Sequence, residues 1–221
     1  MSAFIAILCL IGSGPASGET RRFTFDEGTE GGAPGLFVAA TTGKGEEGAW
    51  VVARAPDAPS APNVVKQTSA DDTSYRFPVL VAAGVQARDG TLSVRFKAIS
   101  GRVDQAAGLV WRYADENNYY IVRANALEDN VVLYKVENGK RSSLAPRGTR
   151  AGTYGVDHEV PGGKWNTLTV RFEGPLFTVS FNDARLFEVE DGTFENAGGV
   201  GIWTKADSVT LFDDLTLESE E

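Results

Sequence analysis

The sequence predicts an all-β protein, a jelly-roll sandwich of two curved antiparallel sheets, and three observations support this prediction. Short runs of alternating apolar and polar residues recur along the chain, and turn-forming segments separate them. No run has the period of an amphipathic helix. Glycine is abundant, at 25 of 221 residues, as expected of a chain with many turns. This length suits one large β domain with a substantial core better than two small domains.

The first eighteen residues differ from the rest of the chain and predict an export signal. They contain no charged side chain, and the apolar run at residues 3–11 is shorter than the ~20 residues that span a bilayer. Ala16 and Gly18 are small residues placed as in a signal-peptidase site. We therefore expect a signal peptide at residues 1–18 and a single exported domain at residues 19–221, in the periplasm, the cell envelope or the extracellular space.

Composition argues against several classes of function. A formal net charge of −9 does not suit a nucleic-acid partner, which calls for a basic patch. The single cysteine, Cys9, lies in the predicted signal, so the exported domain would have no disulfide, thiolate metal site or cysteine nucleophile. No later stretch is long and apolar enough to predict a transmembrane segment.

The elements are expected to follow one another with mainly short turns. A proline-rich segment at residues 55–62 is predicted to be a surface loop, because proline does not fit a central strand. Residues 142–163 are rich in glycine and proline, and a loop of that length is more often functional than idle. Outside the centre of the chain, strands are expected at residues 19–26, 36–40, 49–54, 63–67, 75–81, 91–98, 165–173, 177–181, 186–190, 199–205 and 209–217.

The centre of the chain, residues 104–141, predicts three consecutive antiparallel strands. Alternation in the middle run separates Tyr120, Val122 and Ala124 from a second face with Tyr119, Ile121, Arg123 and Asn125. One apolar face is enough to hold a sandwich together, so aromatic and charged residues on a second face invite a functional explanation. The alternative is that the Arg and Lys stems simply cover aromatic surface.

Carbohydrate is the ligand that this second face favours. A sugar has apolar C–H faces edged by hydroxyls, so its site combines flat aromatic rings with hydrogen-bonding side chains. The pattern leaves open whether Trp111 lies on the ligand face or in the core. The predicted contacts are Trp111, Arg112, Tyr119, Arg123, Asn125, Glu128, Asp129, Lys135 and Trp203.

Candidate catalytic residues are few. Glu188 and Glu190 lie two apart on one predicted strand, and paired carboxylates can act as nucleophile and general acid on a glycoside. An exposed strand face explains the same pair. His158, the only histidine, lies in the long loop, and the chain has no Gly-x-Ser-x-Gly elbow to complete a Ser-His-Asp relay.

No cofactor is required by this chemistry, but a structural calcium ion is one hypothesis, because calcium needs only oxygen ligands. Asp26 ends the first predicted strand, and Asp213 and Asp214 lie in the last one. Terminal strands of a sandwich often pair, which would bring these carboxylates together. The alternative for Asp213, which has the parity of inward-facing leucines, is a hydrogen-bonded carboxylate at a β-bulge.

Three stretches carry a resemblance to a known group of proteins: GLVWRYADENNYYIVRANALEDNVVLYKVENGKR, LFEVED and GVGIWTKADSVTLFDDL. They resemble exported bacterial proteins with the concanavalin A-like lectin/glucanase fold, which are grouped with 3-keto-disaccharide hydrolase domains and family-16 glycoside hydrolases. The resemblance implies a carbohydrate-facing concave sheet. The glucanase signature Glu-x-Asp-x-x-Glu is not intact, since residues 188–191 read Glu-Val-Glu-Asp.

The sequence therefore favours an exported carbohydrate-binding domain and leaves two alternatives. One is a glycoside hydrolase of the 3-keto-disaccharide type, in which a base removes the acidified C2 proton, although no residue can be assigned as that base. The other is a protein-interaction domain of the cell envelope, since fold alone does not determine function.

Overall fold

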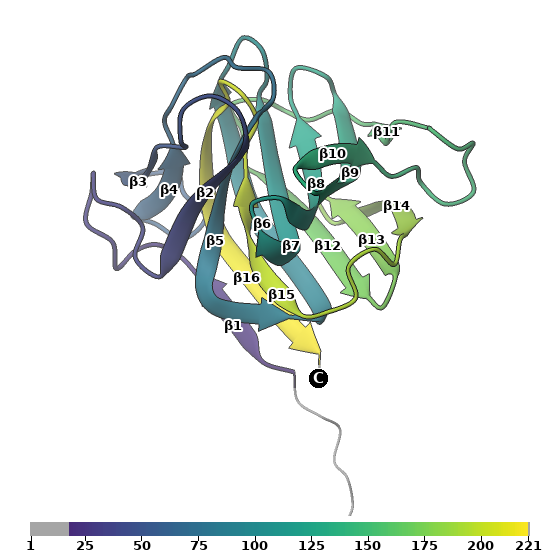
Figure 1. The fold of residues 1–221 in the computed structure, drawn as a ribbon. Coiled ribbons are helices and arrows are strands. Elements are labelled where there is room, and N and C mark those ends of the chain that lie inside the picture. Colours follow the sequence, from purple (N-terminus) through teal and green to yellow (C-terminus); the bar gives the residue numbers. More distant parts are fainter. Residues whose placement is uncertain (1–17, 221) are drawn as a thin grey trace, which may run out of the picture.

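A computed structural model describes residues 18–220, which form two antiparallel β-sheets packed face to face (Figure 1). The predicted all-β sandwich is confirmed. The predicted signal peptide lies outside the described residues except for Gly18. The described part of the chain has no helix that is both long enough and apolar enough to cross a membrane.

Sheet A forms one layer and contains both ends of the described chain. Its strands are β1 (Thr20–Phe23), β3 (Trp50–Arg54), β4 (Asn63–Gln67), β6 (Asp89–Ser100), β12 (Asn166–Glu173), β13 (Leu176–Phe181), β14 (Ala184–Glu190) and β16 (Val209–Glu220). They follow the order β14-β13-β12-β6-β16-β4-β3, and β1 also pairs with β16.

Sheet B forms the other layer. Its strands are β2 (Phe37–Gly43), β5 (Arg76–Ala87), β7 (Ala106–Asp115), β8 (Asn118–Asn125), β9 (Asn130–Glu137), β10 (Lys140–Ser143), β11 (Val156–Asp157) and β15 (Gly198–Trp203). They follow the order β10-β9-β8-β7-β15-β5-β2, and β11 also pairs with β9. The expected three-strand meander is confirmed as β7, β8 and β9. The predicted long loop begins within β10 and also contains β11.

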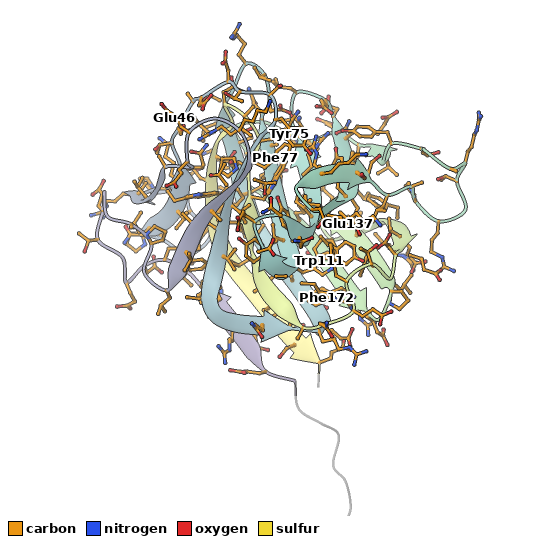
Figure 2. All side chains as sticks on the ribbon, in the orientation of Figure 1. Glu46, Tyr75, Phe77, Trp111, Glu137 and Phe172 are labelled. Atoms are coloured by element: carbon orange, nitrogen blue, oxygen red, sulfur yellow. The ribbon has the colours of Figure 1, made fainter. Side chains whose placement is uncertain are left out.

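The main core lies between the two sheets, and Trp111 is at its centre. The Trp111 ring stacks on Tyr120 and Phe172, with centroids 5.5 and 6.1 Å apart. Figure 2 labels Trp111 and Phe172 where the two layers overlap in the view. Val122 and Leu133 face the same core from β8 and β9. These positions have the parity that the sequence predicted for Tyr120 and Val122, so one face of the meander is confirmed as a core face.

The opposite face of sheet B is also buried, which the sequence did not predict. We call this second group the curl cluster, because sheet B bends over it. Trp203 is fully buried there and stacks on Phe77 at 5.4 Å. The members of the curl cluster are Phe77, Val79, Ala106, Val110, Tyr119, Ile121, Val132, Tyr134, Val136 and Trp203.

Hydrogen bonds between distant strands hold sheet B in this curled shape. The Thr42 hydroxyl on edge strand β2 hydrogen-bonds the Tyr119 hydroxyl at 2.7 Å and donates to the Glu116 carbonyl in the β7–β8 turn at 2.5 Å. The Tyr75 hydroxyl donates to the Gly139 carbonyl at 3.2 Å and accepts from the Arg141 backbone N–H at 2.7 Å. Strands at opposite sides of the sheet therefore approach each other and exclude water from the curl cluster.

Gly108 on β7 leaves room for two large side chains of the curl cluster. A Cβ at this position would lie 2.8 Å from the Ile121 Cδ1 and 3.2 Å from the Trp203 ring. The absent side chain lets these two large residues pack over the strand.

Candidate functional site

The apolar curl cluster gives way to polar side chains where β8 ends and β9 begins. Arg123 on β8 donates from Nη1 to the Asn130 Oδ1 at 2.5 Å and from Nη2 to the Glu128 Oε2 at 2.7 Å. Nη2 also donates to the Tyr154 hydroxyl at 3.0 Å. Tyr154 comes from the long loop, so this loop does contribute to the polar cluster.

A second set of contacts extends the cluster toward the end of β15. The Asn125 amide donates to the Asp104 Oδ1 at 2.8 Å and to the Glu128 Oε1 at 3.1 Å. Lys205 pairs with the Asp104 Oδ2 at 2.7 Å. We call the whole group the Arg123 network; its members are Asp104, Arg123, Asn125, Glu128, Asn130, Tyr154 and Lys205.

The β8–β9 turn positions Glu128 in this network. Asp129, the next residue, adopts a left-handed backbone with φ of 45°. Its carboxylate accepts the Val160 N–H at 3.0 Å, and its carbonyl accepts the His158 N–H at 2.9 Å. The turn is thereby anchored to the long loop, and the Glu128 side chain is directed back toward Arg123.

The network has a buried part and an exposed rim. Asp104, Arg123 and Asn125 are buried, whereas 37% of the Glu128 side chain and 48% of Tyr154 are exposed. Hydrogen bonds from the buried residues fix the orientation of the two rim residues, Glu128 and Tyr154, as a binding site requires. The rim offers a carboxylate, a hydroxyl and an aromatic ring to a ligand in solvent.

Burial raises the pKa of both carboxyls of the network and a neighbouring cation lowers it, but the net shift differs between them. Burial raises the pKa of Asp104 above its ordinary value, and the Lys205 ammonium only partly offsets this. Burial alone would raise the pKa of Glu128 as well, but the Arg123 guanidinium and the Asn130 amide lower it below 4.5. Glu128 is therefore a carboxylate at neutral pH, a good hydrogen-bond acceptor but a weak base.

The structure brings three of the predicted contact residues together, namely Arg123, Asn125 and Glu128. Trp111 is fully buried in the inter-sheet core, so we do not include it among the proposed contacts. Arg112 is 3% exposed and donates to the carbonyls of Arg88, Phe194 and Gly174 at 2.6–3.0 Å, so it fastens loops together instead.

The other predicted contacts also have structural partners. Tyr119 and Trp203 lie on the expected face, but both are fully buried in the curl cluster. Lys135 points to the opposite face of β9, where it donates to the Thr193 hydroxyl at 2.6 Å. Asp129 anchors the turn as described above. None of these four side chains belongs to the Arg123 network.

The candidate catalytic residues lie elsewhere in the fold. Glu188 on edge strand β14 is paired with Arg185 at 2.6 Å and Arg147 at 3.5 Å, and Arg147 also lies 3.6 Å from Glu190. The His158 ring packs edge-on against Phe181 at 5.1 Å. These positions fit the alternative of a solvated, ion-paired strand face for the two glutamates.

The three aspartates of the calcium hypothesis each have a separate partner. The Asp213 carboxylate accepts the N–H and hydroxyl of Ser60, both at 2.8 Å, and lies at a break in the pairing of β16 with β6. Asp214 pairs with Arg22 at 2.7 Å, and Asp26 accepts the Asn63 N–H at 3.0 Å. Among residues 18–220 there is no group of three or more acidic, His or Cys side chains suited to a metal. The alternative of a hydrogen-bonded carboxylate at a bulge describes Asp213.

The predicted contacts omit four members of the network, of which Asn130 begins β9 and the other three lie outside the strands. Asp104 and Lys205 precede β7 and follow β15, and Tyr154 lies in the long loop. Alternation within strands carries no information about residues beyond their ends. The one signal for Tyr154 was the unusual length of its loop.

No family model matches the chain, and no curated protein matches its sequence. Solved structures do match. Carbohydrate-binding module CBM66 from Bacillus subtilis has a TM-score of 0.62 at 21% identity, over 82% of this chain and 95% of that one. The cellulose-induced protein Cip1 has a TM-score of 0.63 at 12% identity, over 90% and 97%. Domain 4 of the extracellular arabinanase AbnA from Geobacillus stearothermophilus, in complex with arabinotriose, has a TM-score of 0.54 at 14% identity, over 90% of each chain.

These matches establish the fold. A Bacillus subtilis protein described as having a galectin-like fold also matches, with a TM-score of 0.53 at 11% identity over 82% of this chain and 89% of that one. The chain is thus a galectin- and concanavalin A-like β-sandwich whose structural neighbours include carbohydrate-binding modules.

Proposed function

We propose that this protein binds carbohydrate through the rim of the Arg123 network. The observation that carries the proposal is the combination of a buried, hydrogen-bonded polar cluster with the partly exposed Glu128 and Tyr154. The Glu128 carboxylate accepts hydrogen bonds from sugar hydroxyls, and the Tyr154 ring packs against an apolar sugar face. The fold shared with a carbohydrate-binding module and with an arabinotriose-bound domain supports the proposal.

Binding accounts for this geometry better than catalysis by a 3-keto-disaccharide hydrolase. That reaction needs a base exposed to the substrate, with a pKa near the working pH. Glu128 is exposed, but its pKa is lowered; Asp104 has a raised pKa, but its side chain is fully buried. The hydrolase is therefore the second candidate.

A protein-interaction role in the envelope is favoured by a different surface. Leu36 and Val38, next to and on edge strand β2, are 75% and 59% exposed. Leu36 also lines a pocket of about 290 Å³ together with Phe23 and Phe37.

Export, proposed from residues 1–18, is compatible with all three functions. The matched arabinanase is described as extracellular.

Calorimetric titration with neutral and acidic plant and bacterial oligosaccharides tests the proposal. We expect Glu128→Gln and Tyr154→Ala to weaken binding about tenfold or more, because each removes a direct contact. Glu173→Gln and Tyr113→Phe on β7 are the controls, since neither residue belongs to the network. Equal affinity in all five proteins, or heat release from none of the sugars, would contradict binding at this site. New reducing ends in the reaction mixture would favour the hydrolase.

A further inference from the structure

Arg141 on β10 is held in place by aromatic faces beside the Arg123 network. Its guanidinium carbon lies 4.4 Å from the ring centroids of both Phe77 and Tyr134, and 5.8 Å from that of Trp203. Such cation–π contacts fix the plane of a guanidinium without using its N–H groups. The side chain as a whole is half-buried.

This guanidinium has no anionic partner in the described chain. Its Nη1 is buried without a hydrogen-bond partner, and no ion pair within residues 18–220 includes Arg141. The neighbouring cations differ, because Arg123 pairs with Glu128 and Lys205 pairs with Asp104. Arg141 is therefore a positive charge beside the network that has no anionic partner in the part of the chain that the structure describes.

Tyr134 places Arg141 in the same site as the network. The Tyr134 hydroxyl hydrogen-bonds the Tyr154 hydroxyl, and the Tyr134 ring lies between the two arginines, 5.9 Å from the Arg123 guanidinium carbon and 4.4 Å from that of Arg141. A ligand that packs on Tyr154 thus comes within one side chain of a fixed guanidinium that has no anionic partner among the described residues.

We propose that the carbohydrate bound at this site is anionic, and that Arg141 recognises its carboxylate or sulfate group. This inference rests on the proposed function and adds the chemical class of the ligand. A planar guanidinium donates two parallel hydrogen bonds to a carboxylate or sulfate, and here the Nε and Nη2 edge is the one that can do so, because Nη1 is buried. A neutral sugar would leave the Arg141 charge unpaired, which selects against it.

Matched pairs of oligosaccharides that differ only in charge provide the test. Trigalacturonate is titrated beside its fully methyl-esterified form, and a sulfated galactan oligosaccharide beside its desulfated form. We expect each charged member to bind about tenfold or more tightly than its neutral partner, as is typical of one charge-assisted hydrogen-bonded pair. Which pair shows the difference identifies carboxylate or sulfate as the recognised group.

Variants then assign the preference to Arg141. Arg141→Gln is expected to remove the advantage of the charged sugar and to leave affinity for the neutral partner unchanged, while Arg141→Lys retains part of the advantage. Arg185→Gln, at an exposed arginine on β14, is the matched control and should bind as the wild type does. Thermal melting of each variant confirms that it is folded.

The outcomes separate the two proposals. Equal affinity for charged and neutral members, with loss of both in Tyr154→Ala, would overturn the anionic class and leave carbohydrate binding standing. A charge preference that survives Arg141→Gln would overturn the role of Arg141. Absence of binding by every sugar, charged or neutral, would overturn both proposals.

Discussion

The two faces of sheet B differ in what their polar and aromatic residues do. On the face toward sheet A, Trp111 and Tyr120 pack against Phe172 and Phe177 in a continuous apolar core. On the other face, Trp203 and Tyr119 occupy the curl cluster, and the same face then continues into Arg123 and Asn125. Both faces therefore use tryptophan for packing, and only one continues into the Arg123 network.

This difference shows that aromatic residues on a strand do not by themselves indicate a ligand platform. When sheet B curls, the aromatic residues of its concave face are covered by the sheet's own edge. The remaining accessible surface lies at the ends of β8 and β9, where polar side chains replace apolar ones. The proposed binding site is consequently displaced from the centre of the concave face to its margin.

Replacement of Trp111 by alanine should give the largest stability loss on the inter-sheet face. We expect unfolding free energy to fall by about 3–5 kcal/mol, the usual cost of removing a large buried ring. Urea denaturation followed by circular dichroism measures it. Trp165→Ala is the control, because Trp165 is only partly buried and should lose less. A near-native midpoint for Trp111→Ala would contradict its placement in the core.

Two buried arginines sharpen the comparison further. Arg112→Met should cost about 2–4 kcal/mol of stability, because three backbone carbonyls lose their charged donor, and should leave glycan affinity unchanged. Arg123→Met should remove glycan binding, since it releases both Glu128 and Tyr154. Denaturation and glycan titration of both variants measure these effects. Loss of binding by an Arg112→Met protein that is still folded would contradict this account.

The two carboxyls of the network predict opposite pH dependences. The pKa of Glu128 is lowered, so its contribution to stability is present above 4.5 and is lost as pH falls through the lowered value. The pKa of Asp104 is raised, so its contribution is present below 3.8 and is lost as pH rises through the raised value.

Denaturation of the wild type, Glu128→Gln and Asp104→Asn across this pH range measures both effects. The stability difference between wild type and Glu128→Gln should grow with rising pH. The difference between wild type and Asp104→Asn should shrink. Parallel curves for the three proteins would show that neither carboxyl is perturbed by folding.

Removal of the Lys135 charge should have the smallest effect. Lys135 is 23% exposed and lies 3.4 Å from Asp191 on the face away from the Arg123 network. We expect Lys135→Met to change stability by less than about 1 kcal/mol, as for other partly exposed ion pairs, and to leave glycan titrations unaltered. Loss of sugar affinity in this variant would bring Lys135 back among the contacts.

Alternation along single strands predicted much of the fold. The two faces of β8 were separated correctly, with Tyr120 and Val122 inward and Tyr119 and Arg123 on the other side. The burial of that second face depends on the contact between Thr42 and Tyr119, which are 77 residues apart. Such a contact has no trace in the local pattern, so the same residues suggested an exposed platform.

The candidate site was predictable only in part for a related reason. Arg123, Asn125 and Glu128 lie within one strand and its turn, where spacing is informative. Their partners Asp104, Tyr154 and Lys205 approach from the ends of other elements. The residues before Trp111 on β7 are apolar on both faces of the strand, so the sequence pattern does not show which face is buried between the sheets. Only the packing of sheet A against sheet B determines which side Trp111 faces.

The central claim is that ligand contacts lie at the margin of the curled sheet and not on its aromatic centre. An amide-resolved NMR titration with the best-binding oligosaccharide tests it most directly. The account predicts saturable shifts at residues 104–105, 125–130, 153–155 and 205, and little change at the backbone around Trp111 or Glu188. Shifts centred on β14 or on the exposed edge of β2, with the Arg123 network unchanged, would contradict it.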